Sequence, residues 1–151
     1  MIERFERFSF AISEISRCWT KIAASEMEKY GLKGSCALYL IAMYRNPEGI
    51  TASHLSEKCG RDKADVSRSV SLMERNGLLH KEGDKKNLYR ARLMLTDEGK
   101  QAAENIAQRA MLAVEMGGKG VNDEERGVFY DTLELIASNL REVSEGGLPP
   151  R

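Results

Sequence analysis

The chain has 151 residues, of which 42% are hydrophobic and 30% are charged, a composition typical of a soluble globular protein. No apolar run approaches the roughly 20 residues of a membrane span, and acids interleaved with bases at the start of the chain argue against a signal peptide. The three cysteines lack the spacing of paired ligands and fit a reducing compartment better than a disulfide framework. We therefore expect a cytoplasmic protein.

The charges are balanced overall but unevenly distributed. Ten Lys or Arg face six Asp or Glu between Thr51 and Leu95, a surplus of +4, whereas the remainder holds thirteen bases and seventeen acids. A basic middle third would direct its local field toward a phosphate backbone. The distribution therefore keeps nucleic acid among the possible partners, although the net charge is zero.

Residues 2–29 have the periodicity of one long helix, which Gly31 would end with a left-handed cap. Large apolar side chains recur every three or four positions and form an N-terminal seam, defined by Phe5, Phe8, Ile12, Ile15, Trp19 and Ile22. A seam of such bulky side chains requires a partner surface.

A second helix is expected from about Ser35 to Arg45, and it is apolar over most of its surface, which places it inside the domain. A turn at residues 46–49 ends it, and Ile50 follows as a short strand residue. Thr51 is a suitable N-cap for a short third helix over residues 52–58.

The stretch 62–76 predicts a fourth helix whose two faces differ sharply. Val66, Val70 and Met73 share its inner face, with Leu72 beside them. Asp62 would cap the helix, and Asp65 resembles the acid of a capping box. Hydroxyls and cations occupy the outer face: Lys63, Ser67, Arg68, Ser71 and Arg75. Such a face suits docking against many hydrogen-bond acceptors, as in the DNA major groove, and the preceding helix and glycine turn complete a helix-turn-helix outline.

A hairpin with a basic tip follows this helix. Gly77 ends the helix, residues 78–82 predict a strand, 83–87 a polar turn and 88–95 the returning strand. One face of the returning strand would carry Tyr89, Ala91, Leu93 and Leu95, and the other Arg90 and Arg92. A hairpin placed directly after a helix-turn-helix is a wing.

Two further helices are expected in the last third of the chain. Thr96 caps the first, which runs to about Met116, and Asn122 with Glu125 caps the second. The second carries a C-terminal seam, defined by Phe129, Leu133, Ile136, Leu140 and Val143. Intramolecular packing would explain the two seams, but their position at opposite ends of the chain favours a homodimer. The last residues, 145–151, form a frayed tail.

These elements and two motifs resemble the MarR family of winged-helix regulators. The first motif is Asp62-x-x-x-Val66-Ser67-Arg68-x-Val70-x-x-Met73-Glu74-x-x-Gly77-Leu78-Leu79, and the second is Leu95-Thr96-Asp97-Glu98-Gly99. The resemblance implies a mainly α fold with a small β-hairpin, in which a winged helix-turn-helix lobe (33–96) is flanked by dimerisation helices (1–30 and 97–144). The sequence departs from the family pattern at the wing tip, where Lys86 takes the position of an arginine. Lysine keeps the charge but lacks the planar guanidinium, so a strong preference of the wing for a narrow minor groove is not expected.

The resemblance implies a homodimer that presents two recognition helices to successive major grooves about 34 Å apart, on a near-palindromic operator. Arg68 is the candidate for bidentate contact with a guanine. The predicted DNA-binding residues are Thr51, Ser53, Lys63, Ser67, Arg68, Ser71, Lys85, Lys86 and Arg90, with Arg92 as a further wing cation and Arg75 as a solvated side chain. No cofactor or catalytic site is expected, because the sequence lacks a phosphate-binding loop, a metal-ligand signature and a nucleophile elbow.

Many members of the resembled family release DNA when they bind small anionic aromatic compounds, and some respond to thiol oxidation. An effector cleft would be lined by Trp19, Cys36, Tyr39, Met43 and Tyr44, although for each of these side chains taken singly a place in the core is the favoured role. Cys18, beside Trp19, is the candidate for a thiol sensor. A third alternative is a winged-helix module that binds proteins without DNA, which would place apolar groups on the outer face of 62–76.

Overall fold

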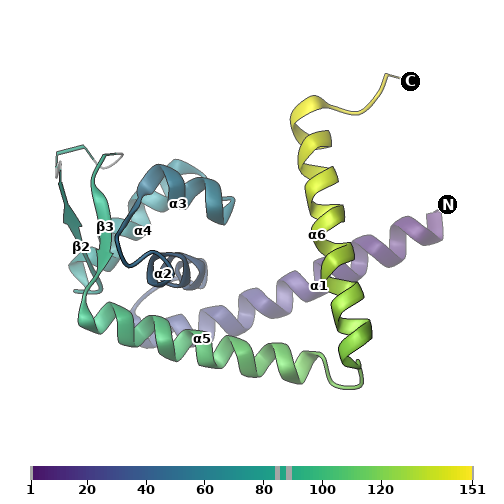
Figure 1. The fold of residues 1–151 in the computed structure, drawn as a ribbon, viewed down its shortest axis with the longest axis horizontal. Helices are drawn as coiled ribbons and strands as arrows, with labels where there is room; N and C mark the ends of the chain where they lie inside the picture. The colour runs from purple at the N-terminus through teal and green to yellow at the C-terminus, as the bar shows by residue number, and fades with distance from the viewer. Residues whose placement is uncertain (1, 84–85, 88–89, 151) are drawn as a thin grey trace. The chain divides into compact units, whose positions relative to one another are not determined.

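The computed structural model describes residues 2–83, 86–87 and 90–150, and its contacts divide the chain into two compact units, Met1–Met111 and Leu112–Arg151 (Figure 1). The elements, in chain order, are α1 (Ile2–Met27), the short helix η1 (Glu28–Tyr30), α2 (Cys36–Tyr44), β1 (Ile50–Thr51), α3 (Ala52–Cys59), α4 (Lys63–Arg75), β2 (Leu79–Glu82), β3 (Arg92–Leu95), α5 (Asp97–Gly117) and α6 (Asp123–Gly146). Within the described residues, no helix combines the length and hydropathy of a transmembrane segment.

The predicted winged helix-turn-helix is present in the first unit. The strands form an antiparallel sheet in the order β1-β3-β2, with Ile50 opposite Leu93 and Leu79 opposite Leu95. β1 thus confirms the short strand expected at Ile50, and it joins the start of α3 to the wing. The fold is mainly helical with this one small sheet, as the sequence predicts.

The returning strand of the wing is shorter than predicted. β3 begins at Arg92, and the described residues directly before it are not part of the strand: the backbone N–H groups of Arg90 and Ala91 both donate to the carbonyl oxygen of Asn87, at 3.0 and 2.9 Å. The expected inward face is nevertheless correct for the described residues, since Ala91, Leu93 and Leu95 are buried. Tyr89, assigned to the same face, lies outside the described residues.

The core of the first unit confirms the predicted inner face of α4. Val66, Val70 and Met73 are buried against α2, α3 and the sheet, and Leu72 packs at the edge of this cluster. The core also takes in one polar side chain of α4, Ser69, which lies beside the thiol of Cys36.

Local capping signals fix the ends of the helices. The hydroxyl of Thr51 accepts a hydrogen bond from the His54 amide at 3.2 Å, and the carboxylate of Asp62 accepts one from the Asp65 amide at 2.7 Å. Between the two helices, Gly60 has φ of +60°, a conformation that favours glycine. The helix-turn-helix therefore follows from short-range chemistry that the sequence displays.

The junction between the wing and α5 is closely packed. The hydroxyl of Thr96 donates to the carbonyl oxygen of Gly77 at 2.6 Å and accepts from the Gly99 amide at 3.1 Å, so it confirms the predicted cap. A Cβ at Gly99 would lie 1.9 Å from the carbonyl oxygen of Leu78. Glycine at this position therefore allows α5 to begin directly against the backbone at the base of the wing.

The second unit contains the end of α5 and helix α6. A full capping box begins α6: the Asn122 side chain accepts from the Glu125 amide and the Glu125 carboxylate accepts from the Asn122 amide, both at 2.9 Å. No residue of α6 is buried. In the C-terminal seam Phe129, Leu140 and Val143 are exposed, and in the first unit the whole N-terminal seam is exposed. The need for a partner surface therefore stands, and the homodimer stays a prediction.

Candidate nucleic-acid interface

The outer face of α4 is polar and accessible, as its sequence predicts. The Arg68 side chain is 66% exposed, Ser71 and Lys63 are exposed, and Ser67 is half-buried. Ser67, Arg68 and Ser71 line an open hollow of about 380 Å³ together with Lys33, Cys36, Ser69, Leu72 and Arg75. Three cations, Lys33, Arg68 and Arg75, therefore border one concave surface, which suits an anionic or acceptor-rich partner.

Two of those cations were not predicted to belong to the site. The sequence predicts Arg75 to be an ordinary solvated side chain, but the structure places it one turn beyond Ser71 on the same hollow. Lys33 precedes α2 and reaches the hollow only because the start of α2 packs beside α4. Residue spacing along α4 could have identified Arg75, whereas no local sequence signal identifies Lys33.

The interpretation of Asp65 as the acid of a capping box is replaced by a different contact. Its carboxylate accepts a hydrogen bond from the hydroxyl of Tyr39 at 2.5 Å, and its second oxygen lies 4.0 Å from Nη2 of Arg68. Burial, followed by the hydrogen bond to Asp65, raises the pKa of Tyr39 well above its usual range. The tyrosine hydroxyl therefore remains a donor at physiological pH.

The start of α3 and the wing share one sheet. Thr51, the N-cap of α3, lies opposite Arg92 of β3, and Arg92 lies opposite Glu82 of β2. Ser53 is exposed in the first turn of α3, where free backbone N–H groups and the helix dipole favour an anion. This register fixes the spacing between the predicted phosphate site at Thr51 and Ser53 and the strands of the wing.

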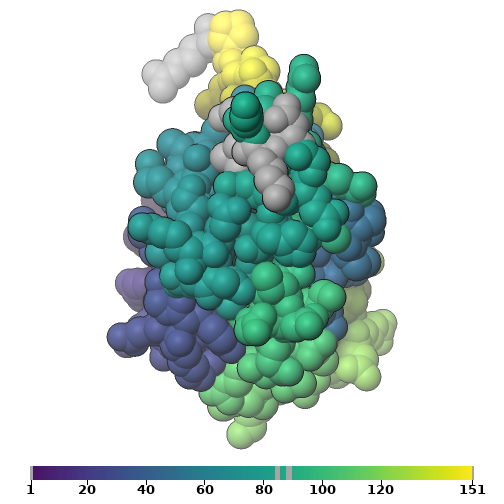
Figure 2. All heavy atoms as spheres, turned by 90° about the vertical axis from the view of Figure 1, so that its left-hand side faces the viewer, coloured from purple at the N-terminus to yellow at the C-terminus, as the bar shows by residue number. Residues whose placement is uncertain are grey.

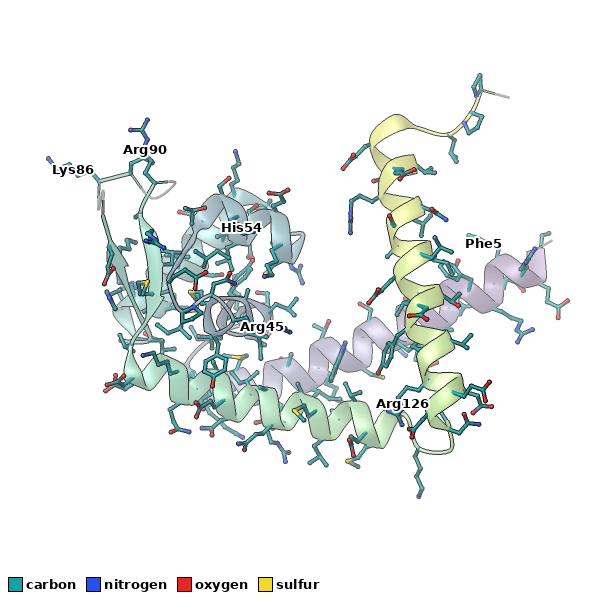
Figure 3. The ribbon with its side chains drawn as sticks, in the orientation of Figure 1. Phe5, Arg45, His54, Lys86, Arg90 and Arg126 are labelled. Atoms are coloured by element: carbon teal, nitrogen blue, oxygen red, sulfur yellow. The ribbon has the colours of Figure 1, made fainter. Side chains whose placement is uncertain are left out.

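Cations project from the tip of the wing. Lys86 and Arg90 are exposed, and Figure 3 shows both side chains pointing away from the helices of their unit. Lys85, the third predicted wing cation, lies outside the described residues. Lys81, at the base of the wing, instead forms an ion pair with Glu74 of α4 at 2.7 Å, so it joins the two elements. From the hairpin side, the teal residues of α4 and the wing form one continuous surface (Figure 2).

The first unit has a second hollow, whose lining residues differ from those of the hollow on α4. It has a volume of about 290 Å³, and apolar side chains from α1, α2 and α5 line it together with three charged groups. Its lining includes Trp19, Ile22, Leu38, Ile41, Ile106, Glu26, Arg61 and Arg109. Glu26 accepts hydrogen bonds from Lys29 at 2.6 Å and from Arg109 at 3.1 Å, and these cations lower its pKa. We call this hollow the α1–α2–α5 cavity.

Most of the predicted effector residues do not line that cavity. Trp19 does, but Cys36, Tyr39 and Met43 are buried in the core of the unit, where the apolar surface of α2 packs under α3 and α4. Tyr44 is directed elsewhere, since its hydroxyl donates to Glu104 at 2.9 Å. The alternative that these side chains fill the core is correct for Cys36, Tyr39 and Met43.

The three cysteines occupy different environments. Cys18 is exposed on α1, whereas Cys36 is buried and Cys59 is half-buried. Burial raises the pKa values of the Cys36 and Cys59 thiols, which disfavours their reactive thiolate forms. Among the described residues, no group of three or more His, Cys, Asp or Glu side chains is arranged to hold a metal ion.

Comparison with known proteins finds a match to one family model over part of the chain and solved structures with a similar fold. Residues 30–87 match the sequence model of the MarR family. A MarR transcriptional regulator from Methanosarcina mazei Go1 is 24% identical, with a TM-score of 0.79 over 91% of this chain and 92% of its own. A putative MarR family transcriptional regulator from Listeria monocytogenes, in complex with a 26mer DNA, is 24% identical, with a TM-score of 0.80 over 93% of this chain and 95% of its own.

A third solved structure, the transcriptional regulator SlyA, is 23% identical, with a TM-score of 0.82 over 91% of this chain and 96% of its own. At these identities the likeness shows a common fold, and it extends over helices at both ends as well as the winged part. No curated protein matches the sequence of this chain.

Proposed function

We propose that this chain is a sequence-specific transcriptional regulator that binds double-stranded DNA. Its residues 30–87 match the MarR family, and its fold is similar to that of solved MarR transcriptional regulators. The observation that carries the proposal is the outer face of α4. Arg68, Ser67 and Ser71 lie on a helix whose inner face is fixed in the core, beside a wing with exposed cations. The Listeria monocytogenes protein of this fold that was crystallised with DNA supports the same role.

In the proposed complex, α4 enters the major groove and Arg68 donates two hydrogen bonds to O6 and N7 of a guanine. Lys63, Ser67 and Ser71 share that face. Lys33 and Arg75, on the rim of the hollow, would contact phosphates, which position the protein without reading sequence. Thr51 and Ser53 would hold a phosphate at the start of α3, and Lys85, Lys86 and Arg90 would follow the backbone beside the wing.

The test is a binding titration on DNA from upstream of the protein's own gene, with Arg68→Ala as the variant. We expect a loss of specific affinity of about tenfold or more, because a bidentate pair contributes about 1–3 kcal/mol of discrimination. Lys100→Ala is a matched control, since Lys100 is an exposed cation that pairs with Asp97 and belongs to α5, not to α4. An unchanged sequence preference in the Arg68 variant would remove its reading role, and absence of binding at low salt would refute DNA binding altogether.

We also propose that the functional form is a homodimer in which the terminal helices, 1–30 and 97–144, provide the interface. The support is the exposed apolar surface of both seams, including Phe5, which is 69% exposed, and Phe129. A row of exposed large apolar side chains along a helix is typical of an interaction site. Sedimentation equilibrium at micromolar concentration should give twice the chain mass, and Ile15→Glu should lower the association constant; a wild-type monomer would contradict the proposal.

We further propose repression that ends when a small aromatic anion occupies the α1–α2–α5 cavity. Its apolar walls suit an aromatic ring, and Arg61 and Arg109 at its border suit a carboxylate. Trp19 is the only tryptophan of the chain and lines this cavity, so its fluorescence reports occupancy directly. Titration with salicylate should change that fluorescence and weaken DNA binding, and Arg109→Ala should weaken the response. Trp19 fluorescence that does not change when such anions are added would contradict the proposal that they bind in this cavity.

Two alternative functions lead to different observations. A thiol sensor acting through Cys18, which is exposed, should lose DNA binding on mild peroxide treatment, and Cys18→Ser should abolish that response. A winged-helix protein-binding module should bind no DNA at low salt. The polar outer face of α4 favours the DNA-binding function over this module.

A further inference from the structure

A buried tyrosine of α2 is connected to the outer face of α4 through a single carboxylate. Tyr39 is fully buried and is among the largest fully buried side chains of the core, so packing fixes the position of its ring. Its hydroxyl donates to Oδ2 of Asp65, in the first turn of α4, at 2.5 Å. A short bond from a fixed donor to a carboxylate sets the orientation of that carboxylate.

The other oxygen of the same carboxylate faces the residue proposed to read DNA. Oδ1 of Asp65 lies 4.0 Å from Nη2 of Arg68, one helical turn later. This separation is too long for a hydrogen bond, but it is short enough for charge attraction to bias the guanidinium. The Asp65 side chain is 20% exposed and that of Arg68 is 66% exposed, so the pair lies at the border between core and solvent.

We propose that Tyr39 is a positioning residue for sequence reading, which holds Asp65 so that its carboxylate orients Arg68 without binding it. The inference rests on the proposed DNA-binding function and extends it to a residue that cannot touch DNA. With one oxygen engaged by Tyr39, Asp65 cannot present both oxygens to the guanidinium in the strong bidentate geometry. The donors of Arg68 therefore remain available for a guanine.

Loss of the tyrosine hydroxyl would release this restraint. In Tyr39→Phe the ring still fills the core, whereas the carboxylate of Asp65 is free to rotate toward Arg68 and pair with it. Arg68 would then have to break that pair before it contacts a base. Sequence-specific binding should weaken, while phosphate contacts, which supply non-specific binding, should be unaffected.

The chain offers a matched control on the same helix. Tyr44 also donates from its hydroxyl to a carboxylate, that of Glu104 at 2.9 Å, but Glu104 belongs to α5 and not to α4. Tyr44→Phe therefore removes one tyrosine–carboxylate hydrogen bond from α2 without altering the recognition helix. Far-ultraviolet circular dichroism of both variants should match the wild type.

The experiment measures specific and non-specific DNA affinity for Tyr39→Phe, Tyr44→Phe, Arg68→Ala and the Tyr39→Phe/Arg68→Ala double variant. We expect Tyr39→Phe to lower the specific-to-non-specific ratio about fivefold, a fraction of the full value of a bidentate contact, with an unchanged salt slope. Tyr44→Phe should leave the ratio unchanged, and Tyr39→Phe should have no further effect when Arg68 is absent. An unaltered ratio in Tyr39→Phe, or an equal loss in the Arg68→Ala background, would overturn the inference.

A measurement without DNA separates this inference from the proposed function. The Nε–Hε signal of Arg68 in the nitrogen-15 NMR spectrum of the free protein reports pairing of its guanidinium. Its hydrogen exchange should slow in Tyr39→Phe and not in Tyr44→Phe, because only the first variant frees Asp65. An identical exchange rate in Tyr39→Phe and wild type would overturn the inference, whereas failure of the wild type to bind any DNA would refute only the proposed function.

Discussion

Replacement of Gly99 by alanine tests how closely α5 must approach the wing. An ideal Cβ at this position would lie 1.9 Å from the carbonyl oxygen of Leu78, 2.9 Å from its carbonyl carbon and 3.2 Å from Cδ2 of Leu95. The nearest contact is backbone, which cannot rotate away as a long side chain can. Either α5 or the base of the wing must therefore move by more than about 1 Å to restore an ordinary carbon–oxygen separation.

The expected cost follows from what that movement breaks. Overpacking a closely packed site costs about 1–3 kcal/mol, and the Leu78 carbonyl also accepts the Thr96 amide at 3.1 Å. Loss of that hydrogen bond adds about 1 kcal/mol. We therefore expect Gly99→Ala to lower the unfolding free energy by about 2–4 kcal/mol, and Tm by about 5–15 °C.

The assay is thermal unfolding followed by circular dichroism at one fixed protein concentration, since an oligomer's Tm depends on concentration. Gly127→Ala is the control: it makes the same change inside α6, where an added Cβ meets no atom within 4 Å. Alanine is the better helix former, so this control should be neutral or slightly stabilising. If Gly99→Ala melts at or above the wild-type temperature, the close approach at Leu78 does not constrain the fold.

Two further changes test the recognition helix and the α1–α5 contact. Asp62→Ala removes the acceptor of the Asp65 amide, so it should lower the free energy of unfolding, measured in urea, by about 1 kcal/mol. Asp62→Asn keeps an acceptor oxygen and should retain most of the wild-type stability. An equal loss of stability in both variants would contradict the capping role. The hydrogen bond from Lys29, and then that from Arg109, lowers the pKa of Glu26. The ionised Glu26 therefore stabilises the fold above its pKa in the unfolded chain, and this stabilisation is lost as the pH falls through its pKa in the folded protein. Glu26→Gln should therefore lower Tm at about pH 7 but not at about pH 3; a difference that persists in acid would refute the ionic origin.

Helix boundaries were predictable where the determining groups are close in sequence. Thr51, Asp62 and Asn122 each cap a helix through an amide three residues later, so the sequence alone displays both partners. The inner face of α4 was predictable for a similar reason, since helical periodicity decides which side chains can be buried together. These signals, in order along the chain, were sufficient to predict the winged helix-turn-helix.

Features that depend on packing between distant segments were not predictable in the same way. The sequence predicts a local capping role for the Asp65 carboxylate, but this carboxylate accepts its hydrogen bond from Tyr39, 26 residues earlier. The walls of the α1–α2–α5 cavity come from three helices. Aromatic character alone suggests Tyr39 and Tyr44 as lining residues, whereas the packing of the helices places Leu38 and Ile106 there. Likewise, no propensity indicates the hydrogen bonds that Arg90 and Ala91, directly before β3, donate to the carbonyl oxygen of Asn87.

Periodicity predicts the helices of the two seams and their apolar sides, but it does not predict which surface covers those sides. Periodicity placed Phe5, Trp19, Phe129 and Leu140 each on the apolar side of its helix, yet all four remain exposed in the single chain. Burial of one such side chain contributes about 1.5–3 kcal/mol, and a helix such as α6, with no buried residue, gains little stability from propensity alone. In the proposed homodimer, the surface that stabilises these helices is also the surface that brings a second α4 to the DNA. Substitutions in the seams should therefore weaken operator binding through the dimer equilibrium, although no seam residue contacts a base.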